Sequence, residues 1–199
     1  MRLGLRALLV AAAGACALPA ATTAQDTWIS GWGGIFMDPG TVRDADSGTQ
    51  WDFGTSMVFG ATAQRLFGNS LIAGVEVGYS PIRHEVRPLD SPAGTPPTAE
   101  GRAHLLSTMA VGRLGGGGGA GFGTYLTGGI GAITYGIPSL DRWDPDLALR
   151  GGGGLEYRHS QRVALFVEWN RWWTFHQAAG VNDNTVQHSH LEVGARYGM

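Results

Sequence analysis

The stretch LIAGVEVGYS, residues 71–80, decides the fold because its side chains change character at every second position. One face carries Leu71, Ala73, Val75, Val77 and Tyr79, and the other carries Ile72, Gly74, Glu76, Gly78 and Ser80. A period of two residues is typical of a β-strand with one apolar face. A charged residue therefore lies at the centre of the face opposite the apolar one.

Similar alternation recurs along the chain and predicts seven further strands. These cover residues 27–37, 51–64, 102–114, 122–135, 149–158, 163–170 and 190–197. In residues 51–64 the apolar face begins with Trp51 and Phe53. The pattern does not decide which face of residues 27–37, 102–114 and 122–135 points inward.

The connections between these runs alternate in length. Residues 38–50, 83–100, 137–146 and 175–184 form long connections, whereas 65–70, 115–119 and 159–161 form short ones. This order places the long loops at one end of an up-and-down meander and both termini at the other. The chain length suits eight strands of about 10 residues, the length that crosses a bilayer when tilted. We therefore predict an all-β fold, an eight-stranded antiparallel up-and-down transmembrane β-barrel.

The first 24 residues are predicted to be a cleavable signal peptide. Arg2 and Arg6 precede an uncharged apolar run over residues 7–18, and small residues occupy the positions before a cleavage point after Ala24. The barrel domain then covers residues 25–199. Because Cys16 is the single cysteine, the mature chain has no disulfide. Export leaves the periplasm, the medium and the outer membrane as destinations.

Composition excludes some classes of partner. All 14 basic residues are arginine, against 16 acidic residues, so the chain offers no lysine-rich nucleic-acid-binding face. We expect no nucleic-acid partner and no cofactor.

The charged residues near strand centres are expected to face the barrel interior. They are Glu76, Arg150, Glu156, Arg158, Glu168, Glu192 and Arg196. An eight-stranded barrel is just wide enough to be filled by side chains, so these groups are expected to form a paired network. A narrow gated channel is the alternative.

Aromatic residues cluster at strand ends, as in the two girdles of a membrane barrel. The expected girdle residues are Trp28, Trp51, Phe53, Tyr79, Tyr157, Trp169, Trp173 and Tyr197.

Four segments carry a resemblance to a known family. Residues 74–79 (GVEVGY), 125–132 (YLTGGIGA), 153–158 (GGLEYR) and 191–197 (LEVGARY) resemble the small eight-stranded outer-membrane β-barrel proteins of Gram-negative bacteria, the OmpA/OmpX-like superfamily. The resemblance implies an outer-membrane location and a structural or surface-interaction role carried by extracellular loops. Its implied partners are outer-membrane lipids, lipopolysaccharide and the outer-membrane assembly machinery; the ligand of the loops is unknown. Met199 stands where the family usually ends in an aromatic residue, and Tyr197 is expected to serve instead.

Two alternatives to this role are an enzyme and a soluble binder. His188, Ser189 and His190, with His176 nearby, occupy the region where lipid A deacylases carry a serine hydrolase site. Adjacent strand residues point to opposite faces, however, so Ser189 and His188 do not meet. We expect no catalytic residues and no metal site, with these histidines solvated at the rim. A lipocalin-like binder would instead need its apolar residues inside.

Overall fold

The computed structural model describes residues 27–37, 41–44, 47–67, 71–92, 94–115, 120–137, 142–175 and 185–199. The predicted signal peptide, residues 1–24, lies outside this part of the chain, as does most of the long loop over 175–184. Within the described part, no helix is long and apolar enough to cross a membrane.

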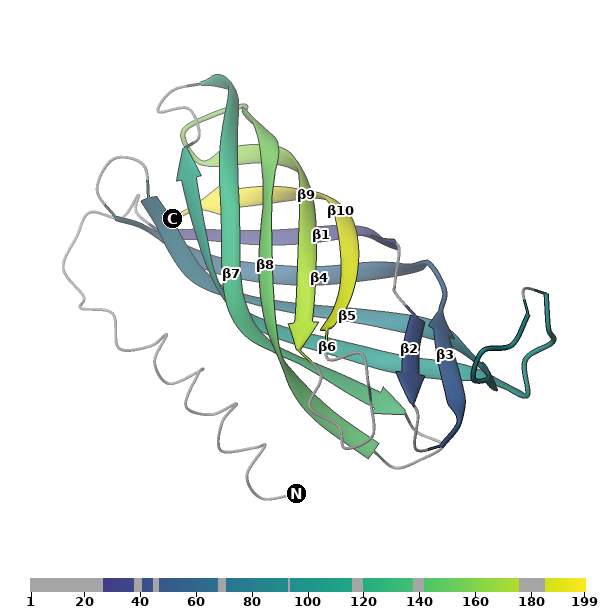
Figure 1. The fold of residues 1–199 in the computed structure, drawn as a ribbon. Coiled ribbons are helices and arrows are strands. Elements are labelled where there is room, and N and C mark those ends of the chain that lie inside the picture. The colour runs from purple at the N-terminus through teal and green to yellow at the C-terminus, as the bar shows by residue number, and fades with distance from the viewer. Residues whose placement is uncertain are drawn as a thin grey trace.

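Ten strand segments form one antiparallel sheet that closes on itself (Figure 1). They are β1 (Thr27–Met37), β2 (Thr41–Asp44), β3 (Thr49–Phe53), β4 (Ser56–Phe67), β5 (Leu71–Pro88), β6 (Ala99–Gly115), β7 (Gly121–Ile137), β8 (Arg142–Arg158), β9 (Val163–Phe175) and β10 (Thr185–Gly198). The strands β1 and β10 pair with each other, and the pairing of β5 with β6 completes the ring. Closure thereby gives each of the strands β1 and β4–β10 a paired neighbour on both sides.

The barrel wall has eight strands, as the alternation predicts, because two of the ten segments, β2 and β3, continue the strands formed by β1 and β4. Both β3 and β4 pair with β5, so they are two parts of one strand of the barrel. β2 follows β1 along the chain and pairs with β3 as β1 pairs with β4. The fold prediction of an eight-stranded antiparallel barrel is therefore confirmed.

The long connections are shorter than predicted, because the strands continue past the apolar band. The expected loop over residues 38–50 includes the hairpin partners β2 and β3. The expected loop over 83–100 shrinks to residues 89–98, since β5 reaches Pro88 and β6 starts at Ala99. Likewise β8 starts at Arg142 rather than after residue 146. The alternation of buried and exposed side chains continues through Ile82 and Arg83, so β5 extends to Pro88 into the segment where the proline content had predicted a loop.

A break between β3 and β4 reverses which side chains of this strand point into the barrel. Six steps along the chain from Phe53 to Phe59 oppose only five from Tyr79 to His84, so one residue is extra between β3 and β4. Such a bulge shifts the register by one, which moves each side chain to the opposite face. The apolar face predicted for residues 51–64 is therefore confirmed beyond the bulge, where Met57 and Phe59 are exposed on the outside, and wrong before it, where Trp51 and Phe53 turn inward.

Facing is consistent around the rest of the wall. Large apolar side chains are exposed on the outside, including Phe59, Val77, Leu126, Leu165 and Val193. The predicted interior face of β5 is buried, with Glu76 only 3% exposed. Strand β1, whose facing was open, points Trp28, Trp32 and Phe36 inward and Ile29 and Ile35 outward. This arrangement inverts the order of a soluble lipocalin-like barrel and rejects that alternative.

Candidate functional site

The interior next to the short turns holds a charged network centred on Glu156. Its carboxylate accepts hydrogen bonds from Arg113, from Arg158 Nε at 2.8 Å and from Arg196 Nη1 at 2.6 Å. Arg113 and Arg196 come from strands β6 and β10, so the contacts cross the interior rather than run along one strand. The side chains of Glu156 and Arg113 are each only 2% exposed. Burial of such charges is tolerated only with this degree of pairing.

A second centre lies farther along the interior around Arg150. The guanidinium bonds Glu76 through Nη1, and its Nη2 donates to Glu168 Oε1 at 2.9 Å. Thr62 donates to Glu76 at 3.2 Å, and Asn170 donates to Glu168 at 2.8 Å. Every carboxylate oxygen of Glu76 and at least one of Glu168 is thereby satisfied.

Tyr125 and Arg196 join the two centres. The Tyr125 hydroxyl donates to Glu168 Oε2 at 2.7 Å and accepts from Arg196 Nη2 at 3.1 Å. Arg113 and Arg196 also lie against the Tyr125 ring, with their Cζ atoms 4.8 and 5.0 Å from its centroid. The guanidinium groups are therefore held by charge and by ring contacts at once.

The structure joins six of the seven expected interior charges in this network and adds two residues that the sequence reasoning missed. The seventh, Glu192, lines the same cavity, and its carboxylate lies 3.3 Å from His190 Nδ1. The missed residues are Arg113 and Tyr125, both on strands whose facing was left open. In β6 both faces are rich in apolar residues, with Met109 and Val111 inward and Leu106 and Leu114 outward. The apolar–polar pattern of β6 therefore could not predict whether Arg113 faces the interior or the outside.

Aromatic rings fill the space that the charges leave. Trp32 lies over Gly60, where an added Cβ would meet its ring and the carbonyl oxygen of Val77 at 2.5 Å. Phe166 lies in the same way over Gly194, with 2.6 Å between an added Cβ and ring atom Cζ. Here glycine is required by close approach of a ring to the wall.

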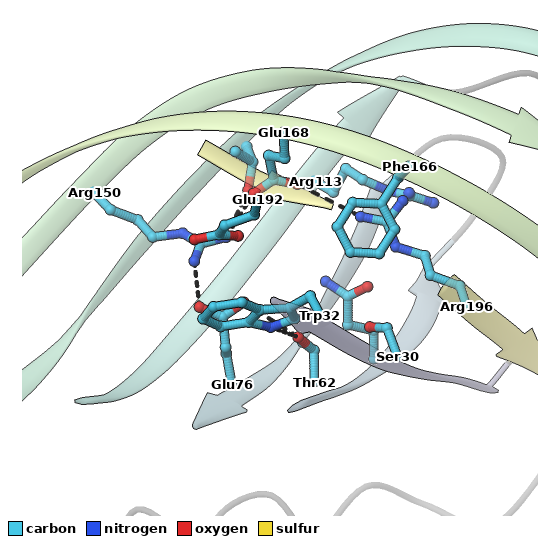
Figure 2. A pocket seen from close by; sticks show the side chains of 12 residues that line it. Ser30, Trp32, Thr62, Glu76, Arg113, Arg150, Phe166, Glu168, Glu192 and Arg196 are labelled. Carbon is cyan, nitrogen blue, oxygen red and sulfur yellow. Dashed lines mark hydrogen bonds and ion pairs between the residues drawn. The ribbon is translucent and has the colours of Figure 1, made fainter. Parts of the chain in front are cut away.

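Among the described residues, a polar cavity of about 10 Å³, room for a single water molecule, lies between the charged groups. Figure 2 shows Trp32 and Phe166 beside the charged groups that line it. At this level of the barrel, charged and aromatic side chains of the described residues fill most of the interior.

Beyond the charged network, the interior becomes apolar. Its buried cluster consists of Phe36, Ile82, Leu105, Met109, Val111, Ile133, Ala148 and Trp172. His188 and His190 stack into this cluster, with ring centroids 5.2 Å apart and Trp172 4.9 Å from His190. The expectation that these histidines are solvated rim residues is wrong, since they are 0% and 1% exposed. They face inward from a strand whose outward side carries Leu191.

Ser189 and the two described histidines, His188 and His190, lie on opposite sides of β10. Ser189 lies on the outer side of β10, where its hydroxyl accepts a hydrogen bond from Arg171 Nη1 at 3.0 Å. His188 and His190 lie on the inner side, and His176 lies outside the described residues. In the part of the chain that the structure describes, no group of three or more His, Cys, Asp or Glu side chains is arranged to hold a metal ion.

The expected girdle residues divide into two sets. Five lie on the outer surface: Tyr79, Tyr157, Trp169, Trp173 and Tyr197. The placement of the other three in a girdle is wrong. Trp28 is 6% exposed and faces the interior beneath Arg158, whose Cζ is 5.5 Å from its ring centroid. Trp51 stacks on His84 and Phe53 packs against the apolar cluster, because the bulge turns β3 over.

Comparisons with known proteins agree with this architecture. The model of the outer membrane protein beta-barrel domain family matches residues 7–198. Neisserial surface protein A is similar in structure, with a TM-score of 0.58 and 12% identity over 87% of this chain and 97% of that one. The outer membrane protein OprG from Pseudomonas aeruginosa has a TM-score of 0.57 and 16% identity over 88% of this chain and 96% of that one. A search of curated protein sequences found no match.

Proposed function

Because the chain belongs to the outer membrane protein beta-barrel domain family and resides in the outer membrane, we propose that it acts there as a closed, non-catalytic barrel that presents an extracellular interaction surface. The observation that carries the proposal is the filled interior. Paired charges occupy one half and an apolar cluster the other, leaving about 10 Å³ between the charged groups. Solutes larger than small ions are expected not to pass.

The outward extension of the strands supports the surface role. The loop over residues 89–98 is tied to the neighbouring hairpin, since Leu89 N donates to Gly48 O at 2.7 Å. Arg87 Nε donates to Thr95 O at 2.9 Å, and Arg43 lies 3.8 Å from Asp90. Loops on a rigid scaffold are where binding function usually resides. An ordered platform also lowers the entropy that a partner must remove on binding.

The orientation and the role can be tested on cells. An epitope inserted after Gly94 is expected to be reached by antibody on intact cells, because the long connections of such barrels lie outside. Replacing residues 89–98 by a two-residue Asn-Gly turn is expected to leave heat-modifiable gel migration unchanged while reducing adhesion of intact cells to matrix-coated surfaces. Adhesion equal to wild type would contradict the surface role, and antibody binding only after permeabilisation would reverse the orientation.

The closed interior can be tested on purified protein. We expect no large stable conductance in planar bilayers and no release of acyl chains from lipid A by mass spectrometry. A large conductance would instead support the channel alternative. Acyl release that is lost in the His188→Ala, His190→Ala double variant would support an enzyme.

A further inference from the structure

Two arginines face each other on the outer surface of the barrel wall. Arg83 of β5 pairs directly with Arg102 of β6, and both side chains are exposed. Like charges directly opposite each other on one face of an antiparallel pair are destabilising. Among the described residues, neither guanidinium has an ion pair or a side-chain hydrogen bond. Among those residues, no carboxylate therefore lies within ion-pair distance of either arginine.

The height of the pair on the wall matches the headgroup region of a bilayer. Outward residues of β5 are apolar or small from Leu71 to Tyr79, and those of β6 from Leu106 to Leu114 lack charge, nine residues in each strand. That length crosses the hydrocarbon of a bilayer. The arginines follow four residues beyond, roughly 10 Å along the barrel axis for tilted strands. Arginine stems extend several ångströms back toward the apolar surface.

A third donor lies between the arginines and the apolar band. His104 shares a face with Arg102, and its ring stacks on Tyr79 with centroids 5.9 Å apart. The Tyr79 hydroxyl is 2.7 Å from His104 Nδ1. When the hydroxyl donates this bond, the imidazole carries its proton at Nε2 and can donate it to another group.

The nearest acids lie on the far side of the pair. Glu85 pairs with Glu100, two residues farther along each strand from the apolar band. Arg87 bonds the Glu85 carboxylate and also holds Asp52. The side of the arginine pair that faces the bilayer is consequently bordered by His104 and Tyr79 rather than by carboxylates.

We propose that Arg83, Arg102 and His104 bind a phosphate group on a lipid headgroup of the outer leaflet, with the phosphorylated glycolipid lipid A as the source. Guanidinium groups match phosphate oxygens in bidentate geometry, and a phosphate between the two arginines removes their repulsion. The inference goes beyond the surface role, because the partner is the surrounding membrane and the outer loops take no part.

The test measures lipid retention by folded protein. Wild type and the Arg83→Gln, Arg102→Gln double variant are refolded in neutral detergent and titrated with bisphosphorylated lipid A, with bound lipid counted by native mass spectrometry. We expect affinity to fall about tenfold or more in the double variant. Arg162→Gln, which removes an exposed arginine from the turn at the other end of the barrel, is the matched control and is expected to bind as wild type does. Heat-modifiable migration verifies folding of each variant.

Further arms identify the ligand chemistry. Dephosphorylated lipid A is expected to bind no better to wild type than to the double variant, and the Arg83→Lys, Arg102→Lys variant is expected to retain part of the affinity. Inorganic phosphate is expected to displace the lipid poorly. Equal lipid A binding by wild type and the Gln variant would overturn the site, and efficient displacement by free phosphate would overturn the lipid assignment.

Discussion

Replacing Glu156 by glutamine tests whether the interior charges are held as a shared network. The carboxylate serves three arginines, but their alternatives differ. Arg196 keeps Glu168 at 3.5 Å, and the partly exposed Arg158 reaches water. Arg113 has no second carboxylate among the described ion pairs and is buried. Because an unpaired buried charge remains, we expect the free energy of unfolding to fall by about 3–5 kcal/mol.

Glu76→Gln is the matched comparison, since it also removes one buried carboxylate charge. Its partner Arg150 keeps Glu168 at 2.9 Å, and Thr62 can still donate to the amide oxygen. No cation is then left alone, so the expected loss is about 1–2 kcal/mol. The asymmetry between the two variants, rather than either value alone, carries the argument.

The assay is urea unfolding of protein refolded in lipid vesicles, followed by tryptophan fluorescence and by heat-modifiable migration. Adding Arg113→Met to Glu156→Gln is expected to recover much of the loss, because it removes the orphaned cation. Equal losses in the two single variants, or a larger loss for Glu76→Gln, would refute the assignment of partners.

Three further changes test facing and packing in the same assay. Val77→Arg places a charge at the centre of the outward apolar face and should cost about 2–4 kcal/mol. Gly60→Ala should cost about 1–3 kcal/mol because the new methyl group meets the Trp32 ring, whereas Gly31→Ala, with no atom within 4 Å, should be neutral; equal effects would disprove the ring contact. His188→Phe should preserve or raise stability, since both ring nitrogens of the buried histidine lack hydrogen-bond partners among the described residues, and a marked loss would indicate an undetected polar role.

The sequence predicted the part of the barrel where one side of each strand faces lipid and the other faces the charged interior. There Glu76 and Val77 must face opposite ways, and the alternation reads directly as structure. Beyond the apolar band, the outer face of the extended strands carries polar residues, so the alternation of apolar and polar residues no longer distinguishes a strand from a loop. The bulge before Ser56 adds one residue without any change in composition, which is why the facing of Trp51 was misassigned. Trp28 was misassigned because aromatic residues suit both a filled interior and a girdle.

The sequence separations within the charged network bear on how the barrel closes. Arg113 and Glu156 are 43 residues apart, Arg150 and Glu76 are 74 apart, and Arg196 and Tyr125 are 71 apart. The partners of each pair lie two or three strands apart in the sheet, so no single hairpin supplies them and they meet only when several strands are correctly aligned. A strand that slips by one residue would turn its charges toward lipid, and a slip by two would leave them buried and unmatched. The charged network therefore favours the correct register of the strands, because a slip of one or two residues leaves buried charges without partners.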